Sequence, residues 1–177
     1  MTATAGACGA KTYLSRERAL AQAFGADAQV ETRTVFLAAD AVKRAEAAAS
    51  AKLASPRVTA YIGRRGERLL GTAYLDTHPV RSMSETVLIV VSPAGRAAAV
   101  EVLAFNEPED YLPPRRWLDT LEDRALARDL KPGDAVPHLG GATLTARAVT
   151  AAVRRTLAVH AEVAAALGSA LSPVGEP

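Results

Sequence analysis

The middle of the chain alternates apolar and polar residues with a period of two, which is the pattern of β-strands. Short turns at Gly63–Gly66 and Ser92–Gly95 separate the alternating runs, and strands joined by such turns are antiparallel neighbours. The run Thr86–Val91 is apolar on both faces, as in strands that lie inside a sheet. We therefore predict a meander of about four strands, over Val58–Ile62, Arg68–Asp76, Thr86–Val91 and Arg96–Phe105.

A further strand is predicted ahead of the meander, over Gln29–Leu37. Four residues there occupy every second position, which indicates a half-buried strand: Val30, Thr32, Thr34 and Phe36. We expect this strand at an edge of the sheet.

Besides a small helix with Pro114 in its first turn, three helices are predicted around the strands. Ser15 is a favourable N-cap for a helix over Arg16–Phe24, which the following glycine ends. Asp40 is expected to cap an alanine-rich helix that reaches about Leu53. The longest helix is expected over Leu144–Leu167, where one face carries a continuous stripe: Val149, Val153, Leu157, His160, Val163 and Leu167.

Strands grouped in the middle of the chain and helices at both ends predict an α+β fold with an antiparallel sheet. The 177 residues suffice for one domain with a sizeable core and are too few for two. We assign this domain to residues 13–168 and expect flexible tails at 1–12 and 169–177. No apolar run is long enough to cross a membrane.

Composition excludes several functional classes. Lys and Arg number 21 against 19 Asp and Glu, and aromatic residues make up only 5%, so there is no signature of nucleic-acid binding. The single cysteine, Cys8, excludes an internal disulfide and a cysteine-built metal site. The three histidines have no metal-ligand spacing, and no nucleophile elbow, Walker motif or dinucleotide fingerprint is present.

The first ten residues, MTATAGACGA, do not have the basic and apolar parts of an export signal. Two interpretations stay open: a cytosolic protein with a plain tail, or a protein from which a signal has been removed. The small residues Ala5–Ala7 before Cys8 also resemble the site at which lipoproteins receive lipid.

The start of the long C-terminal helix is the first candidate site. Gly140 and Gly141 precede Thr143 there, and a helix N-terminus offers free N–H groups and a positive dipole end to a phosphate. In the alternative interpretation the glycines only turn the chain and Thr143 caps the helix.

Two predicted loops are further candidates. Thr77–Thr86 contains His78, Arg81, Glu85 and Thr86, which are either binding residues or a solvated connection between strands. The segment Phe105–Trp117 contains Phe105, Glu107, Tyr111 and Trp117. Its three aromatic residues either wall a flat apolar ligand or form a small core beneath a rigid loop.

The segment Gly141–Val149 (GATLTARAV) resembles the flavinylation motif of FMN-binding domains. That family includes a component of the sodium-pumping quinone reductase and a component of the Rnf complex. Three further segments resemble small stand-alone members of the family and follow in its order: Arg81–Ser92 (RSMSETVLIVVS), Phe105–Pro108 (FNEP) and Tyr111–Trp117 (YLPPRRW). The resemblance covers roughly Val58 to Leu157.

The resemblance implies an electron carrier with FMN joined through a phosphoester to Thr143. It also implies a magnesium-dependent flavin transferase that takes the flavin from FAD, an extracytoplasmic location, and an electron donor and acceptor that the sequence does not identify. The residues expected to bind FMN are Gly140, Gly141, Ala142, Thr143, Leu144 and Thr145 in the motif, and Arg81, Glu85, Thr86, Glu107, Tyr111 and Trp117 around the isoalloxazine ring.

Two positions depart from the family motif. Gly140 stands where Ser or Thr is usual, and Pro137 stands where many members have an acidic residue six positions before the acceptor. Both belong to the part of the motif that the transferase is thought to read. Two alternatives to the covalent electron carrier therefore stay open: a flavin-free binding or scaffold module of the same fold, and an FMN-dependent reductase that holds FMN without a covalent bond.

Overall fold

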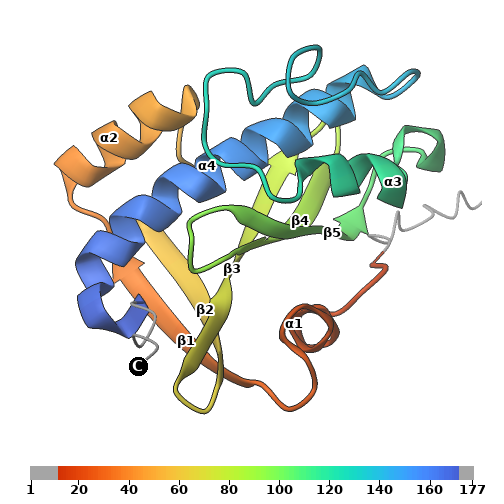
Figure 1. The fold of residues 1–177 in the computed structure, drawn as a ribbon. Coiled ribbons are helices and arrows are strands. Elements are labelled where there is room, and N and C mark those ends of the chain that lie inside the picture. Colours follow the sequence, from red (N-terminus) through yellow and green to blue (C-terminus); the bar gives the residue numbers. More distant parts are fainter. Residues whose placement is uncertain (1–11, 172–177) are drawn as a thin grey trace, which may run out of the picture.

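The computed structural model describes residues 12–171, which form a five-stranded antiparallel sheet with helices on both faces (Figure 1). The strands lie in the sheet in the order of the chain, with β1 at one edge and β5 at the other. They are β1 (Gln29–Phe36), β2 (Arg57–Arg65), β3 (Arg68–Pro79), β4 (Ser84–Val91) and β5 (Ala97–Phe105). The predicted α+β fold, the meander and the edge position of the first strand are confirmed.

Three of the described helices have more than two turns: α1 (Arg16–Phe24), α2 (Ala39–Ala49) and α4 (Thr143–Leu167). α1 and α4 pack on the sheet, whereas α2 packs against α4. The remaining helices described are short, namely α3 (Arg115–Leu118) and the 3-10 helices η1 (Glu109–Tyr111), η2 (Asp119–Leu121) and η3 (Gly168–Leu171). The Ser15 hydroxyl accepts a hydrogen bond from the Arg18 N–H, so the predicted cap of α1 is confirmed.

α1 covers one face of the sheet, where its apolar residues form a core with strand residues such as Leu88, Val90 and Leu103. The helix approaches β2 so closely that a Cβ atom on Gly63 would lie 2.5 Å from ring carbons of Phe24. A glycine is therefore needed at position 63 for α1 to reach the sheet.

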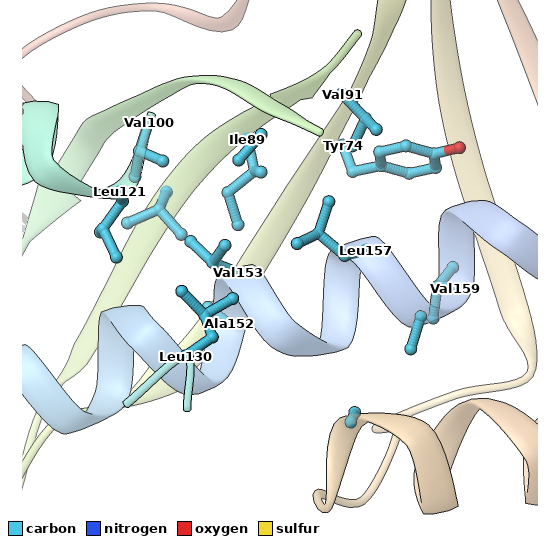
Figure 2. Packing of buried hydrophobic residues seen from close by; sticks show 14 of the residues in the cluster. Tyr74, Ile89, Val91, Val100, Leu121, Leu130, Ala152, Val153, Leu157 and Val159 are labelled. Carbon is cyan, nitrogen blue, oxygen red and sulfur yellow. The ribbon is translucent and has the colours of Figure 1, made fainter. Parts of the chain in front are cut away.

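α4 crosses the opposite face of the sheet, with α2 beside it (Figure 1). Figure 2 shows the larger core that results, in which Ile89 and Val100 from the sheet face Val153 of α4. Most of the predicted stripe on this helix is buried, whereas His160 is half-buried and its Nδ1 lies 2.9 Å from the Tyr74 hydroxyl. Because β4 supplies residues to both cores, the prediction that Thr86–Val91 lies inside the sheet is also confirmed.

Two predictions about the N-terminal half are wrong. β1 is exposed along almost its whole length, because α1 and α4 pack mainly over β3, β4 and β5 and leave this edge uncovered. α2 ends at Ala49, before the predicted Leu53, and Asp40 lies in its first turn without capping it. The helix ends early because the backbone of Ser50 adopts a left-handed conformation. Beyond it, the Glu46 carboxylate accepts a hydrogen bond from the Leu53 N–H at 3.1 Å.

Some residues of the predicted flexible tails, 1–12 and 169–177, belong to the folded domain. Thr12 forms an isolated bridge with Ala104 of β5. At the other end, Gly168–Leu171 continues as a 3-10 helix and Leu171 is buried in the larger core. Cys8 and the remainder of both predicted tails lie outside the described residues.

Candidate functional site at the start of the long helix

A cavity of about 220 Å³ lies where the start of α4 meets the β3–β4 turn and the segment after β5. Its lining consists of Val80, Arg81, Glu107, Tyr111 and the five residues Gly141–Thr145. Of the twelve residues predicted to bind FMN, eight line this cavity, and Gly140, Glu85, Thr86 and Trp117 do not. Val80 also lines the cavity and is not predicted from the sequence, although it directly precedes the predicted residue Arg81.

The backbone before α4 turns at Gly141, whose φ of 78° is a left-handed conformation that favours glycine. Thr143 is the first helical residue, it is exposed, and no side chain caps the helix. The interpretation in which Thr143 caps α4 is therefore wrong. The N–H groups of Thr143, Leu144 and Thr145 have no acceptor within the helix, because the first N–H groups of any helix do not.

Thr145 lines the cavity and is buried. Its side chain is only 1% exposed, and its Oγ1 has no hydrogen-bond partner among the described residues. A buried hydroxyl without a partner costs stability, and this cost is recovered when a bound group accepts its hydrogen bond. The site thus combines a buried hydroxyl donor with the uncapped N–H groups of α4.

Glu107 fixes the turn that forms another wall of the cavity. Its Oε1 accepts hydrogen bonds from the backbone N–H groups of Met83 at 2.8 Å, Ser82 at 2.7 Å and Arg81 at 3.1 Å. These bonds favour the ionised carboxylate and hold the pKa of Glu107 below its usual value. Glu107 therefore anchors the turn that brings Arg81 to the cavity.

Glu85 and Thr86 lie in β4, so the prediction of a loop over Thr77–Thr86 is wrong. The β3–β4 hairpin continues to the pair Pro79–Ser84 and leaves only residues 80–83 as its turn. Thr86 pairs with Thr77 across the hairpin, with 2.9 Å between the two hydroxyl oxygens. Glu85 is fully buried beside His78.

The buried Glu85 belongs to a charged cluster between the sheet and α4. Its Oε2 lies 3.3 Å from Nε2 of His78, whose Nδ1 lies 2.8 Å from Oδ1 of Asp76. Arg155 of α4 donates two hydrogen bonds to the Asp76 carboxylate, at 2.8 and 3.0 Å. Sequence reasoning did not find this cluster, although polar residues at every second position after Tyr74 were a signal for it.

The ionisation of this cluster follows from burial and charge. Burial disfavours charge on His78, but the two carboxylates outweigh it and raise the pKa of this ring to about 9. Burial raises the pKa of Glu85, whereas hydrogen bonds from His78 and Arg155 overcome the burial of Asp76 and lower its pKa. His78 is therefore cationic at neutral pH, held between the two carboxyl groups.

The aromatic residues of Phe105–Trp117 are divided between core and cavity. Phe105 and Trp117 are buried, and the indole Nε1 of Trp117 donates a hydrogen bond to the Pro137 carbonyl at 2.9 Å. Only Tyr111 lines the cavity, where it is half-buried. The three aromatic residues therefore do not form a common wall for a ligand.

These features define an α+β domain with a cavity at the start of its longest helix. Comparisons with protein-family models, with curated proteins and with solved structures find no match for the chain. Within residues 12–171, no group of three His, Cys, Asp or Glu residues is placed to hold a metal ion. In the same part of the chain, no helix is both long enough and apolar enough to span a membrane.

Proposed function

We propose that this protein is an electron carrier that bears FMN covalently on the hydroxyl of Thr143. The observation that carries the proposal is the position of Thr143, which is exposed at the first residue of α4 and lines the cavity of about 220 Å³. An exposed hydroxyl is accessible to a transferase, and the cavity beside it offers room for the group that becomes attached.

The residues around Thr143 suit a phosphodiester. Such a group carries one negative charge, which the positive end of the α4 dipole and its uncapped N–H groups stabilise. Thr145 supplies a buried hydroxyl without a partner, and the exposed Arg81 supplies a cation at the same cavity. The residues present therefore fit the phosphate end of FMN.

The size of the cavity favours covalent attachment over reversible binding. Sites that enclose a whole small ligand have volumes of about 300–1,000 Å³, so a cavity of about 220 Å³ encloses only part of FMN. A reductase that held FMN by non-covalent contacts alone would need a larger enclosed surface. A covalent bond to Thr143 removes this requirement, because the flavin then stays bound whatever its redox state.

The attachment balances as a transfer of an FMN group from FAD. A phosphoester bond forms at the Thr143 oxygen, the pyrophosphate bond of FAD breaks, AMP leaves, and the hydroxyl proton is released. Bound FMN then supplies the electron-transfer chemistry. The chain's own residues hold the phosphate, present the apolar side chain of the exposed Leu144, and position Arg81 through Glu107. An extracytoplasmic location and unidentified redox partners are part of the same proposal.

The test is co-expression with a magnesium-dependent flavin transferase, followed by intact-mass measurement under denaturing conditions. The wild-type chain is expected to gain the mass of one FMN less one water. Thr143→Ser keeps a hydroxyl and is expected to gain the same mass, whereas Thr143→Ala is expected to gain none. The neighbouring variant Thr145→Val retains the acceptor and is expected to remain labelled, at lower yield.

Three outcomes would contradict the proposal. A wild-type chain of unmodified mass would favour the flavin-free module. Yellow protein that loses its colour on denaturation would favour an enzyme with non-covalent FMN. A Thr143→Ala variant that still carries flavin after denaturation would place the attachment on another residue.

A further inference from the structure

The strands β2 and β3 separate at one end of the sheet, on the side away from their turn. They pair from Arg65 and Arg68 as far as Tyr61 and Ala73, and the pairing stops there. Both strands nevertheless continue, β2 through residues 57–60 and β3 through residues 74–79. Figure 1 shows the two strands diverging at this end. Within the described residues, the facing edges of these two segments have no strand partner.

Each of the separated segments is held in a regular β conformation by its outer neighbour. β1 pairs with β2 as far as Phe36 and Arg57, and β4 pairs with β3 as far as Pro79 and Ser84. The two inner edges therefore present main-chain N–H and C=O groups at the spacing of a β-ladder. Edges of this kind are templates for a further strand.

A cavity of about 530 Å³ occupies the gap between the two strands. Tyr61, from the core beneath α1, and Tyr74, from the core beneath α4, both line it, so the cavity runs between the strand edges and reaches both faces of the sheet. Thr156 and Val159 of α4 line it as well. The cavity is separate from the one at Thr143, because the two have no lining residue in common.

The cavity has more cationic than anionic lining groups. Lys52, Arg57, Arg155 and the protonated His78 line it, against Asp76 as the single carboxylate among its lining residues. Arg155 and His78 both contact Asp76, His78 also contacts the buried Glu85, and Lys52 is paired with Glu46. Neither Glu85 nor Glu46 lines the cavity. Arg57 is exposed at the first position of β2. An anionic side chain is therefore favoured in a ligand of this cavity.

We propose that the gap between β2 and β3 binds an extended peptide with an acidic side chain, which joins the sheet as an additional strand. The main-chain groups of both inner edges bind the peptide backbone, and the surplus of positive charge selects the acidic side chain. The proposal does not depend on the flavin, because it concerns different residues.

The test is selection from a displayed library of random eight-residue peptides against the wild-type chain, followed by affinity measurement by fluorescence anisotropy. Leu75→Trp fills the gap from an exposed lining residue, and Val30→Trp adds the same side chain at a similarly exposed site outside it. Enriched peptides are expected to contain an acidic residue, to bind wild type and Val30→Trp equally, and to bind Leu75→Trp at least tenfold more weakly.

A second pair of variants tests the charge. Arg57→Glu is expected to weaken binding of the enriched peptides about fivefold, whereas Arg68→Glu, on an exposed residue at the other end of β3, is expected to leave it unchanged. Hydrogen exchange of the backbone amides is expected to slow in residues 57–60 and 74–78 when the peptide binds.

The proposal is overturned by any of four results: no peptide is enriched, the enriched peptides bind Leu75→Trp as well as wild type, exchange slows only elsewhere in the chain, or the wild-type chain is a dimer that Leu75→Trp converts to a monomer. The last result would assign the gap to a second copy of this chain. Loss of flavin loading would affect none of these measurements, so the two proposals fail independently.

Discussion

Replacing His160 with glutamine is expected to remove part of the loss of stability in acid. Burial disfavours the charged imidazole and lowers the pKa of His160 from 6.5 to about 4 in the folded protein. The neutral ring shares a hydrogen bond with the Tyr74 hydroxyl, with 2.9 Å between oxygen and Nδ1. The glutamine amide has both a donor and an acceptor for this hydroxyl, but it does not titrate.

The sign of the effect follows from proton binding. Below about pH 6.5 the unfolded chain binds a proton at His160 that the folded chain does not bind until about pH 4. The stability contributed by the neutral ring is therefore complete above pH 6.5 and is lost as the pH falls through 4. One pKa unit corresponds to about 1.4 kcal/mol, so the lowered pKa corresponds to at most about 3.5 kcal/mol, and less because the ring is half-buried.

The assay is urea unfolding at several pH values between 7 and 4, followed by the fluorescence of Trp117, the single tryptophan, which is buried in the folded state. Wild type is expected to lose more stability than His160→Gln as the pH falls. The difference between their free energies of unfolding is expected to change by up to about 3 kcal/mol between pH 7 and 4. His138→Gln, at an exposed histidine, serves as the control. Curves for wild type and His160→Gln that stay parallel down to pH 4 would refute the reasoning.

Three further predictions concern packing and the cavity at Thr143. Leu121→Ala removes a fully buried side chain from the larger core and is expected to lower the free energy of unfolding by about 2–5 kcal/mol; an unchanged urea midpoint would contradict this core assignment. Gly63→Ala places a Cβ against the ring of Phe24 and is expected to cost about 1–3 kcal/mol in the same assay, whereas equal stability would show that α1 can move away freely. Glu107→Ala removes the acceptor of three backbone N–H groups, so hydrogen exchange at Arg81–Met83 is expected to accelerate and flavin loading to fall; unchanged exchange would refute the anchoring role.

The parts of the fold that the sequence predicts are those decided by neighbouring residues. The cap at Ser15 is a contact over three positions, and the turns that order the meander are equally local. The end of α2 differs from the prediction because the Glu46 side chain binds the Leu53 N–H beyond the helix, a contact that helix propensity does not describe. β1 differs because alternation of apolar and polar residues reports two faces but not whether anything covers them.

The residues of the candidate site likewise divide into those that the local sequence predicts and those that depend on distant contacts. Gly141–Thr145 is one contiguous motif, and all five of its residues line the cavity. The remaining walls depend on contacts between distant segments, above all the bond from the Arg81 N–H to Glu107. Glu85 is predicted in a loop because the apolar residues of the β3–β4 hairpin end before it, whereas the strand pairing continues. Its partner His78 is seven positions away in the sequence, on the other strand of the hairpin. A pattern along one segment does not contain this pairing.

The central claim, that Thr143 carries FMN, is tested most directly by peptide mapping of protein made beside a flavin transferase. Trypsin is expected to release residues 129–147 as one peptide, because Arg128 and Arg147 bound it and Pro132 protects the bond after Lys131. Tandem mass spectrometry is expected to find FMN on this peptide, at Thr143. The same peptide without flavin, or with flavin on Thr145, would contradict the account.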